Sequence, residues 1–349
     1  AYWPVGTSAF YGSLYAVFGT DPIVATLANV VLGTLLIGAT FWLACTRFDE
    51  RVAKLAAIFT AVWPTWIALT TIMSSELAST LFLAAGLAVL LSGRGQDWLR
   101  TVLATGLFVI AAYFRANYLP IALMLPALTA LSRRSAPYFI KQALLSGLTA
   151  AVLLAPWMIR NHRAFAEVVP ISTNFGVNLW IGSNPDAHGG YMEPPPIGEG
   201  QSAGNEVQQD KAYRNHAMAY IAANPGHYAL LCGKRIIQTF DRETYGVSWN
   251  ADGLPDATEA PLKIVMTSYW LAIFVTAGIG LLLFISRSWI NLFDPLIIAS
   301  GMVSATSILV LAADRFHYGL APIIACFAAY ALLGRANTAA DDRTKVAAR

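Results

Sequence analysis

Nine apolar stretches dominate this sequence, and they restrict it to helices that cross or line a lipid bilayer. The chain is 56% hydrophobic and only 12% charged, whereas soluble domains average about 25% charged residues. Because a backbone in hydrocarbon must satisfy its own hydrogen bonds, such stretches fold as helices. The expected spans are 22–46, 55–73, 77–92, 101–115, 118–132, 142–159, 263–285, 295–313 and 318–334. The sequence therefore predicts an all-α polytopic membrane protein with about nine transmembrane helices.

Basic residues in the short loops indicate the orientation of these spans. Nine Lys and Arg residues lie in loops 47–54, 94–100, 133–141 and 286–288. The short loops between them carry only Arg115 and Arg315, so the basic loops are expected in the cytoplasm. The predicted division is an N-terminal transmembrane part over 1–159, a large outer, periplasmic loop domain over 160–262, C-terminal transmembrane helices over 263–335 and a cytoplasmic tail over 336–349.

The outer loop contains segments with different patterns. Residues 168–184 alternate apolar and small polar side chains, which favours irregular structure or short strands with turns. Residues 204–224 are rich in helix formers, and residues 226–240 place apolar side chains at helical spacing, so two helices are expected. On the second of these, Lys234 and Arg235 are expected either to contact lipid phosphates or to form a solvated face.

Three of the apolar hairpins carry charged or polar residues only at their tips. These are Ser74-Ser75-Glu76, Arg115-Ala116-Asn117, and Asp314-Arg315-Phe316-His317-Tyr318. A charge within hydrocarbon is costly, so such residues usually face a pocket or a water path. The expected orientation puts all three tips on the outer side. The sequence thus predicts a polar site at the outer membrane surface, as in an enzyme or a transporter.

Several function classes find no support in the sequence. It has no Gly-rich phosphate loop, no zinc-binding His-Glu-x-x-His and no Gly-x-Ser-x-Gly elbow. A net charge of +3 without a basic stripe or nucleic-acid module makes nucleic acid an unexpected partner. Three cysteines are too few for a disulfide framework.

Four stretches of the chain are similar to motifs of a known superfamily. They are Tyr2-Trp3-Pro4-Val5-Gly6-Thr7, Ala155–Asn161, the run Ile171–Pro185 (ISTNFGVNLWIGSNP), and Asp314–Tyr318 with Pro322. Together they resemble the GT-C superfamily of membrane glycosyltransferases, in particular the branch of protein O-mannosyltransferases, aminoarabinose transferases and galacturonosyl transferases. Compared with that branch the chain looks N-terminally truncated, because the first helix and first outer loop would precede Tyr2.

The resemblance implies transfer of a sugar from a polyprenyl-phosphate donor to a lipid, polysaccharide or protein acceptor. The expected setting is the outer face of a bacterial inner membrane, with membrane lipids as further partners. Such a displacement needs a carboxylate to take the proton of the acceptor hydroxyl. It also needs cations, which are Arg, Lys or a metal, to stabilise the departing phosphate. The catalytic acidic residue is expected upstream of Ala1, so this chain alone is expected to be inactive; a divalent metal stays open as a cofactor.

Candidate site residues follow at the three tips. Glu76 is expected to be an active-site group, contacting the acceptor or a metal, or else a simple charge at a helix start. Arg115 and Arg315 are expected to contact the donor phosphate rather than snorkel to the interface. Asn117 and Tyr318, which lie close to them in sequence, are also expected to bind the phosphate or sugar of the donor. Asp314 is expected to pair with Arg315, and His317 to be a satisfied interfacial histidine.

Further candidates lie at the start of the outer loop. Arg160 is expected either to anchor at lipid headgroups or to contact the donor phosphate. Asn174, Asn178 and Trp180 suit sugar binding through amide hydrogen bonds and aromatic stacking, while turn formation and loop packing explain them equally well. Two other classes also stay open: a transporter of a polyprenyl-linked or saccharide substrate, and a non-catalytic partner in cell-envelope polysaccharide assembly.

Overall fold

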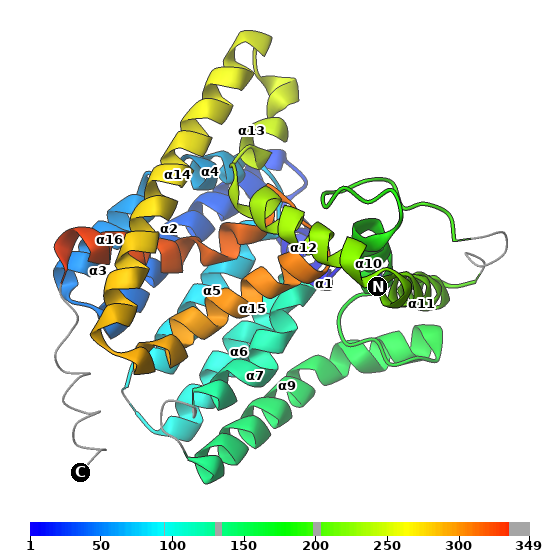
Figure 1. Cartoon of the computed structure of the whole chain (residues 1–349), viewed down its shortest axis with the longest axis horizontal. Coiled ribbons are helices and arrows are strands. Elements are labelled where there is room, and N and C mark those ends of the chain that lie inside the picture. Colours follow the sequence, from blue (N-terminus) through cyan, green and yellow to red (C-terminus); the bar gives the residue numbers. More distant parts are fainter. Residues whose placement is uncertain (94, 130–134, 198–203, 335–349) are drawn as a thin grey trace.

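The protein is an all-helical bundle with a smaller group of helices at one end (Figure 1). The computed structural model describes residues 1–93, 95–129, 135–197 and 204–334. It is 80% helical, and those residues contain no strand. The tail expected over 336–349, and the basic loop residues Arg94, Arg133 and Arg134, lie outside the described residues.

The first half of the chain supplies most of the bundle. Its elements are α1 (Val5–Phe18), α2 (Pro22–Arg47), α3 (Glu50–Ala61), α4 (Pro64–Ala68), η1 (Leu69–Thr71), α5 (Glu76–Leu91), α6 (Asp97–Phe114), η2 (Ala116–Tyr118), α7 (Leu119–Leu128) and α9 (Ala136–Phe165). Between α3 and α4 the chain bends by 49°, because Pro64 offers no N–H to continue the helix and instead starts the next one. The segment from α3 to η1 is therefore a broken helix, and it ends a few residues before Glu76, the first residue of α5.

The second half supplies the helices of the loop expected over 160–262 and the rest of the bundle. Its elements are α10 (Phe175–Ser183), α11 (Glu206–Ala223), α12 (Pro225–Phe240), α13 (Tyr245–Ser248), η3 (Ala251–Gly253), α14 (Asp256–Arg287), η4 (Trp289–Phe293), α15 (Pro295–Leu309), η5 (Asp314–Leu320) and α16 (Ala321–Leu333). Helices α10, α11 and α12 lie together at one end of the bundle (Figure 1).

Helices of membrane-spanning character occupy the places predicted from the sequence. In the part of the chain that the structure describes, five segments are long and apolar enough to cross a membrane: α2, α6, α9, α14 and Asp314–Leu333. The bent α3–η1 segment raises the number to six, and α5, η2–α7 and α15 are shorter apolar helices. Each of the nine expected spans thus corresponds to a helical segment, three of them shorter than a full crossing. The prediction of an all-α polytopic membrane protein is confirmed.

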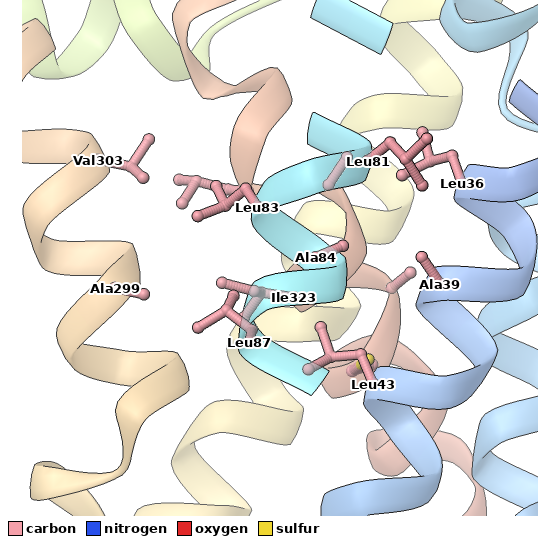
Figure 2. Packing of buried hydrophobic residues seen from close by; sticks show 14 of the residues in the cluster. Leu36, Ala39, Leu43, Leu81, Leu83, Ala84, Leu87, Ala299, Val303 and Ile323 are labelled. Atoms are coloured by element: carbon pink, nitrogen blue, oxygen red, sulfur yellow. The ribbon is translucent and has the colours of Figure 1, made fainter. Parts of the chain in front are cut away.

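Helices α5 and α16 form the centre of the bundle. Helix α5 is apolar on all sides, and it packs mainly against α6 and α2, while α15 and α16 also lie beside it (Figure 2). In that view, Leu36, Ala39 and Leu43 of α2 meet one side of α5, and Ala299 and Val303 of α15 face the other. A helix that is apolar all round is suited to such a fully enclosed position. Because the rest of α5 is packed in the core, its first residue, Glu76, is held in a fixed position.

The outer helices correct one expectation and confirm two. Residues 168–184, expected to be irregular or short strands, contain helix α10. The reason is tertiary: at Gly176 the backbone of α10 lies so close to α11 that a Cβ would collide with Asp210 and Arg214. The Asp210 carboxylate also accepts the Gly176 N–H at 2.6 Å. The two helices expected over 204–224 and 226–240 are present as α11 and α12.

Candidate active site

The three hairpin tips meet at one buried carboxylate. Glu76 starts α5, and its side chain is 2% exposed. Arg115, which follows the last residue of α6, donates from Nη1 to Glu76 Oε1 at 2.6 Å. Arg315, in η5, places its Nη1 3.8 Å from the same oxygen. Residues separated by 39 and then 200 positions in the sequence thus form one charged cluster.

Aromatic rings position the two guanidinium groups. The Arg315 guanidinium lies 4.8 Å from the ring centre of Tyr245 and donates to the Tyr245 hydroxyl at 2.8 Å. The Phe316 ring centre lies 5.3 Å from the Arg115 guanidinium and 5.7 Å from that of Arg315. Such contacts attract a cation to the ring face and restrict its rotamers. Burial, together with the nearby Glu76 carboxylate, raises the pKa of Tyr245, so its hydroxyl stays neutral.

The cluster has a surplus of positive charge and an open side. Two guanidiniums surround one carboxylate, which leaves a formal charge of about +1. The side chains of Glu76 and Arg115 are 2% and 12% exposed, whereas that of Arg315 is 34% exposed. The surplus charge is therefore accessible from the Arg315 side. Guanidinium groups present forked N–H donors that suit phosphate and carboxylate oxygens, so the arrangement can bind an anion.

The other candidates near these tips support the cluster. Asn117 donates to the Thr306 hydroxyl at 3.3 Å, which links η2 to α15. Tyr318 is buried, with its ring 5.7 Å from that of Trp66 and 6.4 Å from that of Tyr245. The Tyr318 ring therefore packs edge to face with the Tyr245 ring and helps to hold it in place.

The expected Asp314–Arg315 pair is replaced by two different contacts. The Asp314 carboxylate accepts hydrogen bonds from the backbone N–H groups of Thr244 and Tyr245, at 2.9 Å and 3.1 Å. It also accepts the Thr244 hydroxyl at 2.8 Å. Arg315 instead faces Glu76 and Tyr245. Adjacent residues of η5 point to different partners, which sequence proximity alone could not indicate.

The candidates of the outer loop lie outside this cluster of contacts. Arg160 is exposed near the end of α9, where it lies over the Trp157 ring and donates to Asn161. Asn174 precedes α10 and accepts a hydrogen bond from Ser172, and Asn178 is half-buried in α10. Trp180 is buried, and its indole N–H donates to Pro195 O at 2.9 Å. For Trp180 the structure favours loop packing over sugar stacking.

A second cluster of buried polar groups includes His317, which is hydrogen-bonded as expected but lies in the interior, and Glu243, which was not among the predicted site residues. Glu243 is fully buried between α12 and α13, and its Oε1 lies 3.0 Å from His317 Nε2. The Trp63 indole N–H and the Thr65 hydroxyl also donate to this carboxylate. In the sequence, His317 was noticed only because it lies two positions after Arg315. No local pattern pointed to Glu243, which lies between α12 and α13.

Arg235 is also buried, which contradicts both the lipid-phosphate contact and the solvated face expected for it. Its side chain is 0% exposed, so it contacts neither lipid phosphates nor solvent. The guanidinium donates to Ile308 O at 2.9 Å and to Gly182 O. Both carbonyls belong to the last turns of helices, α15 and α10, where the helix dipole favours a cation. Burial lowers the pKa of Arg235, and these carbonyls replace the carboxylate that such a residue usually has.

A divalent metal does not fit the described residues. No group of three or more His, Cys, Asp and Glu side chains that could hold a metal ion occurs among them. At the candidate site the Glu76 carboxylate already faces two guanidiniums, whose charge opposes a cation. At this site the positive charge is therefore supplied by the two arginines.

Comparison with known proteins finds solved structures with a similar fold. No protein-family description and no curated protein matches the sequence. Two structures of the oligosaccharyltransferase AglB from Archaeoglobus fulgidus match the fold, one tethered to an acceptor peptide with the NVT sequon and one in complex with an inhibitory peptide and a dolichol-phosphate. Their TM-scores are 0.56 and 0.57, each at 13% identity over 95% of this chain.

The chain has the GT-C fold. It spans 41% and 42% of the length of the two AglB chains. ArnT from Cupriavidus metallidurans, bound to undecaprenyl phosphate, also matches, with a TM-score of 0.43, 14% identity, and coverage of 95% of this chain and 67% of that one. The two AglB matches confirm the fold that was expected from the sequence resemblance.

Proposed function

We propose that this chain is the membrane part of a glycosyltransferase that takes a sugar from a polyprenyl-phosphate carrier. The observation that carries the proposal is the pair of guanidiniums, Arg115 and Arg315, around the buried Glu76 carboxylate. The GT-C fold supports it, because AglB, a membrane oligosaccharyltransferase with that fold, is known in complex with a dolichol-phosphate.

In this proposal Arg315 and Arg115 bind the phosphate of the donor. Arg315 uses one N–H for the Tyr245 hydroxyl and stands 3.8 Å from Glu76, beyond hydrogen-bond distance. Other donors of its fork can therefore turn toward a ligand on the exposed side. Glu76 holds the Arg115 guanidinium in place. A carboxylate engaged in this way is a poor general base, so its role is to position the cations.

The proposed reaction is a displacement at the anomeric carbon of the sugar. The acceptor hydroxyl oxygen forms the new bond to that carbon, and the bond from the carbon to the phosphate oxygen breaks. The electron pair of the broken bond remains on the phosphate, where the two guanidiniums stabilise the added charge. The hydroxyl proton passes to a carboxylate base other than Glu76, because the Glu76 carboxylate is engaged by Arg115.

The setting and the remaining contacts are part of the proposal. The distribution of basic residues between loops supports an outer-facing site, periplasmic in a bacterial inner membrane. The division at 159, 262 and 335 follows from the same topology. Asn174 and Asn178 at the start of α10 stay candidates for contacts to the sugar, and Arg160 for an anchor at the headgroups. The acceptor is a lipid, a polysaccharide or a protein.

Binding of farnesyl phosphate, a short polyprenyl phosphate, tests the proposal directly. The full-length protein in nanodiscs is compared with its Arg115→Gln and Arg315→Gln variants, and farnesol serves as the probe without phosphate. Loss of a charge-assisted contact is expected to weaken farnesyl phosphate binding by about tenfold or more in each variant. Farnesol binding is expected to be unchanged. Arg163→Gln, which removes an exposed arginine of α9, is the matched control.

The same variants separate the proposal from its alternatives. Transfer of a sugar from a polyprenyl-phosphate donor should fall with phosphate affinity in both variants. Equal farnesyl phosphate affinity in the native protein and in both variants would remove the basis for the site. If the full-length protein moves the lipid across the bilayer without forming a glycosylated product, the transporter class becomes the better description.

A further inference from the structure

Two short segments from distant parts of the chain are joined at consecutive residues. We use the name clasp for residues 243–245 and 314–317. Within it, His317 contacts Glu243, Asp314 accepts hydrogen bonds from Thr244 and Tyr245, and Arg315 donates to the Tyr245 hydroxyl. Arg315 is therefore fixed on both sides along the chain, by the residue before it and by the residue two positions after it.

The partners of the two His317 ring nitrogens show that the Glu243–His317 contact is a hydrogen bond between buried groups. His317 Nδ1 lies 2.5 Å from Thr239 O, and a carbonyl can only accept, so Nδ1 carries a proton. Nε2 faces the Glu243 carboxyl, which also receives the Trp63 and Thr65 donors. The Nε2–Oε1 contact thus holds one further proton. Both side chains are fully buried, and without that proton an uncompensated carboxylate would remain in the interior, which is costly.

The surroundings of the pair restrict its movement. The His317 ring stacks on Trp270 of α14, with 3.9 Å between ring centres. The backbone of Glu243 exchanges hydrogen bonds with the Thr267 hydroxyl, also on α14. Trp63 and Thr65 lie at the bend between α3 and α4. The pair is therefore held by α14 and by the α3–α4 bend, and because His317 belongs to η5, these contacts also fix η5.

We infer that Glu243 and His317 are positioning residues for the donor phosphate: they set the place of Arg315 relative to Glu76 without contacting the ligand. This inference rests on the proposed function of Arg315. Both side chains of the pair are buried, so in this inference neither of them touches the ligand. The pair therefore affects donor binding by fixing η5 and Tyr245, which together set the position of the Arg315 guanidinium.

A double-mutant cycle distinguishes this role from general support of the fold. The dissociation constant of farnesyl phosphate is measured in nanodiscs for the full-length native protein, Glu243→Gln, Arg315→Gln and the double variant. In the native background Glu243→Gln is expected to weaken binding about tenfold, the scale of a lost buried hydrogen bond. In the Arg315→Gln background the same change is expected to matter less than about twofold, because the two residues act as a unit. Glu259→Gln, at an exposed Glu–Lys pair of α14, is the matched control.

Each result supports or overturns the inference. An equal loss from Glu243→Gln in both backgrounds overturns it, and so does an unchanged affinity in a protein that Arg315→Gln weakens. If Arg315→Gln itself has no effect, the proposed function fails together with the inference. Thr65→Val, which removes one donor and leaves the Glu243 side chain in place, repeats the cycle if Glu243→Gln does not fold. His317→Gln should show the same dependence on Arg315.

Discussion

Arg315 and Arg235 look alike in the sequence but have opposite surroundings in the structure. Each lies in the outer part of the chain next to apolar residues. Arg315 is one-third exposed and faces a carboxylate and a tyrosine hydroxyl, in a cluster with an uncompensated positive charge. Arg235 is fully enclosed and donates to the last turns of α10 and α15. The first arginine keeps donors available for a ligand, whereas the second uses its donors to join two helices.

The difference shows that the accepting groups around an arginine decide its role. Carbonyls at helix ends are fixed and neutral, so they hold a guanidinium permanently and leave its charge unavailable. A carboxylate shared by two guanidiniums leaves a positive surplus that attracts anions. Substitutions in the two regions should therefore separate loss of stability from loss of ligand binding.

The largest effect is expected for Glu76→Gln, which removes the shared carboxylate. Arg115 would remain largely buried without its partner, and breaking a buried ion pair on one side costs about 3–5 kcal/mol. Thermal unfolding in nanodiscs measures the loss. Glu50→Gln, at an exposed pair with Lys54, is expected to change little. If Glu76→Gln melts like the native protein, Glu76 is not the anchor of the cluster.

Arg235→Met should cost somewhat less and should leave the ligand site intact. Two charge-assisted hydrogen bonds to helix ends are lost, together worth about 3 kcal/mol. The folded fraction is expected to bind farnesyl phosphate with native affinity. The control is Lys234→Met, which changes the exposed neighbouring residue. A variant that melts normally but binds the probe poorly would reverse the roles given to the two arginines.

Gly182→Ala should disturb the same helix junction by crowding. A Cβ at Gly182 would overlap the Val310 carbonyl oxygen and press on the Arg235 guanidinium. Forcing a methyl group into such a packed contact costs about 1–3 kcal/mol, again visible as a lower melting temperature. Gly233→Ala on α12 has open space around it and is the matched control. Equal melting of the two alanine variants would contradict the close approach of α10 to α15.

The smallest effect on stability is expected for Arg315→Gln. Its ion pair is long and partly exposed, and such pairs contribute less than about 1 kcal/mol. The melting temperature should therefore stay near that of the native protein, while farnesyl phosphate binding falls. A loss of stability as large as that of Arg235→Met would mean that both arginines are structural.

Much of the fold could be predicted from hydropathy, because apolar length alone limits a segment in lipid to a helix. The nine expected spans and the helices α11 and α12 correspond to helical segments. Loop charges and hairpin tips also predicted that Glu76, Arg115 and Arg315 would share one surface. The structure brings these three together; their role with a phosphate stays a prediction.

What could not be predicted depends on tertiary contacts. Helix α10 forms in a segment of alternating polar and apolar residues because Gly176 and Gly182 let it lie against its neighbours. In the sequence, Arg235 follows Lys234 on an amphipathic helix, which is typical of a surface position. Its burial is explained only by the carbonyl groups at the ends of α10 and α15. Glu243 meets His317 across 74 positions of sequence, and no local pattern predicts a partner at that distance.

The clasp also makes local unfolding and ligand binding parts of one equilibrium. Residues 243–245 connect α12 to α13 and supply Tyr245 to the arginine cluster, so opening this segment breaks the hydrogen bonds to Asp314 and removes a contact of Arg315. A ligand that prefers the closed form must lower the population of the open one by the same free energy. Amide hydrogen exchange across the start of α13 would therefore slow as the phosphate site fills, although no ligand atom needs to touch those amides.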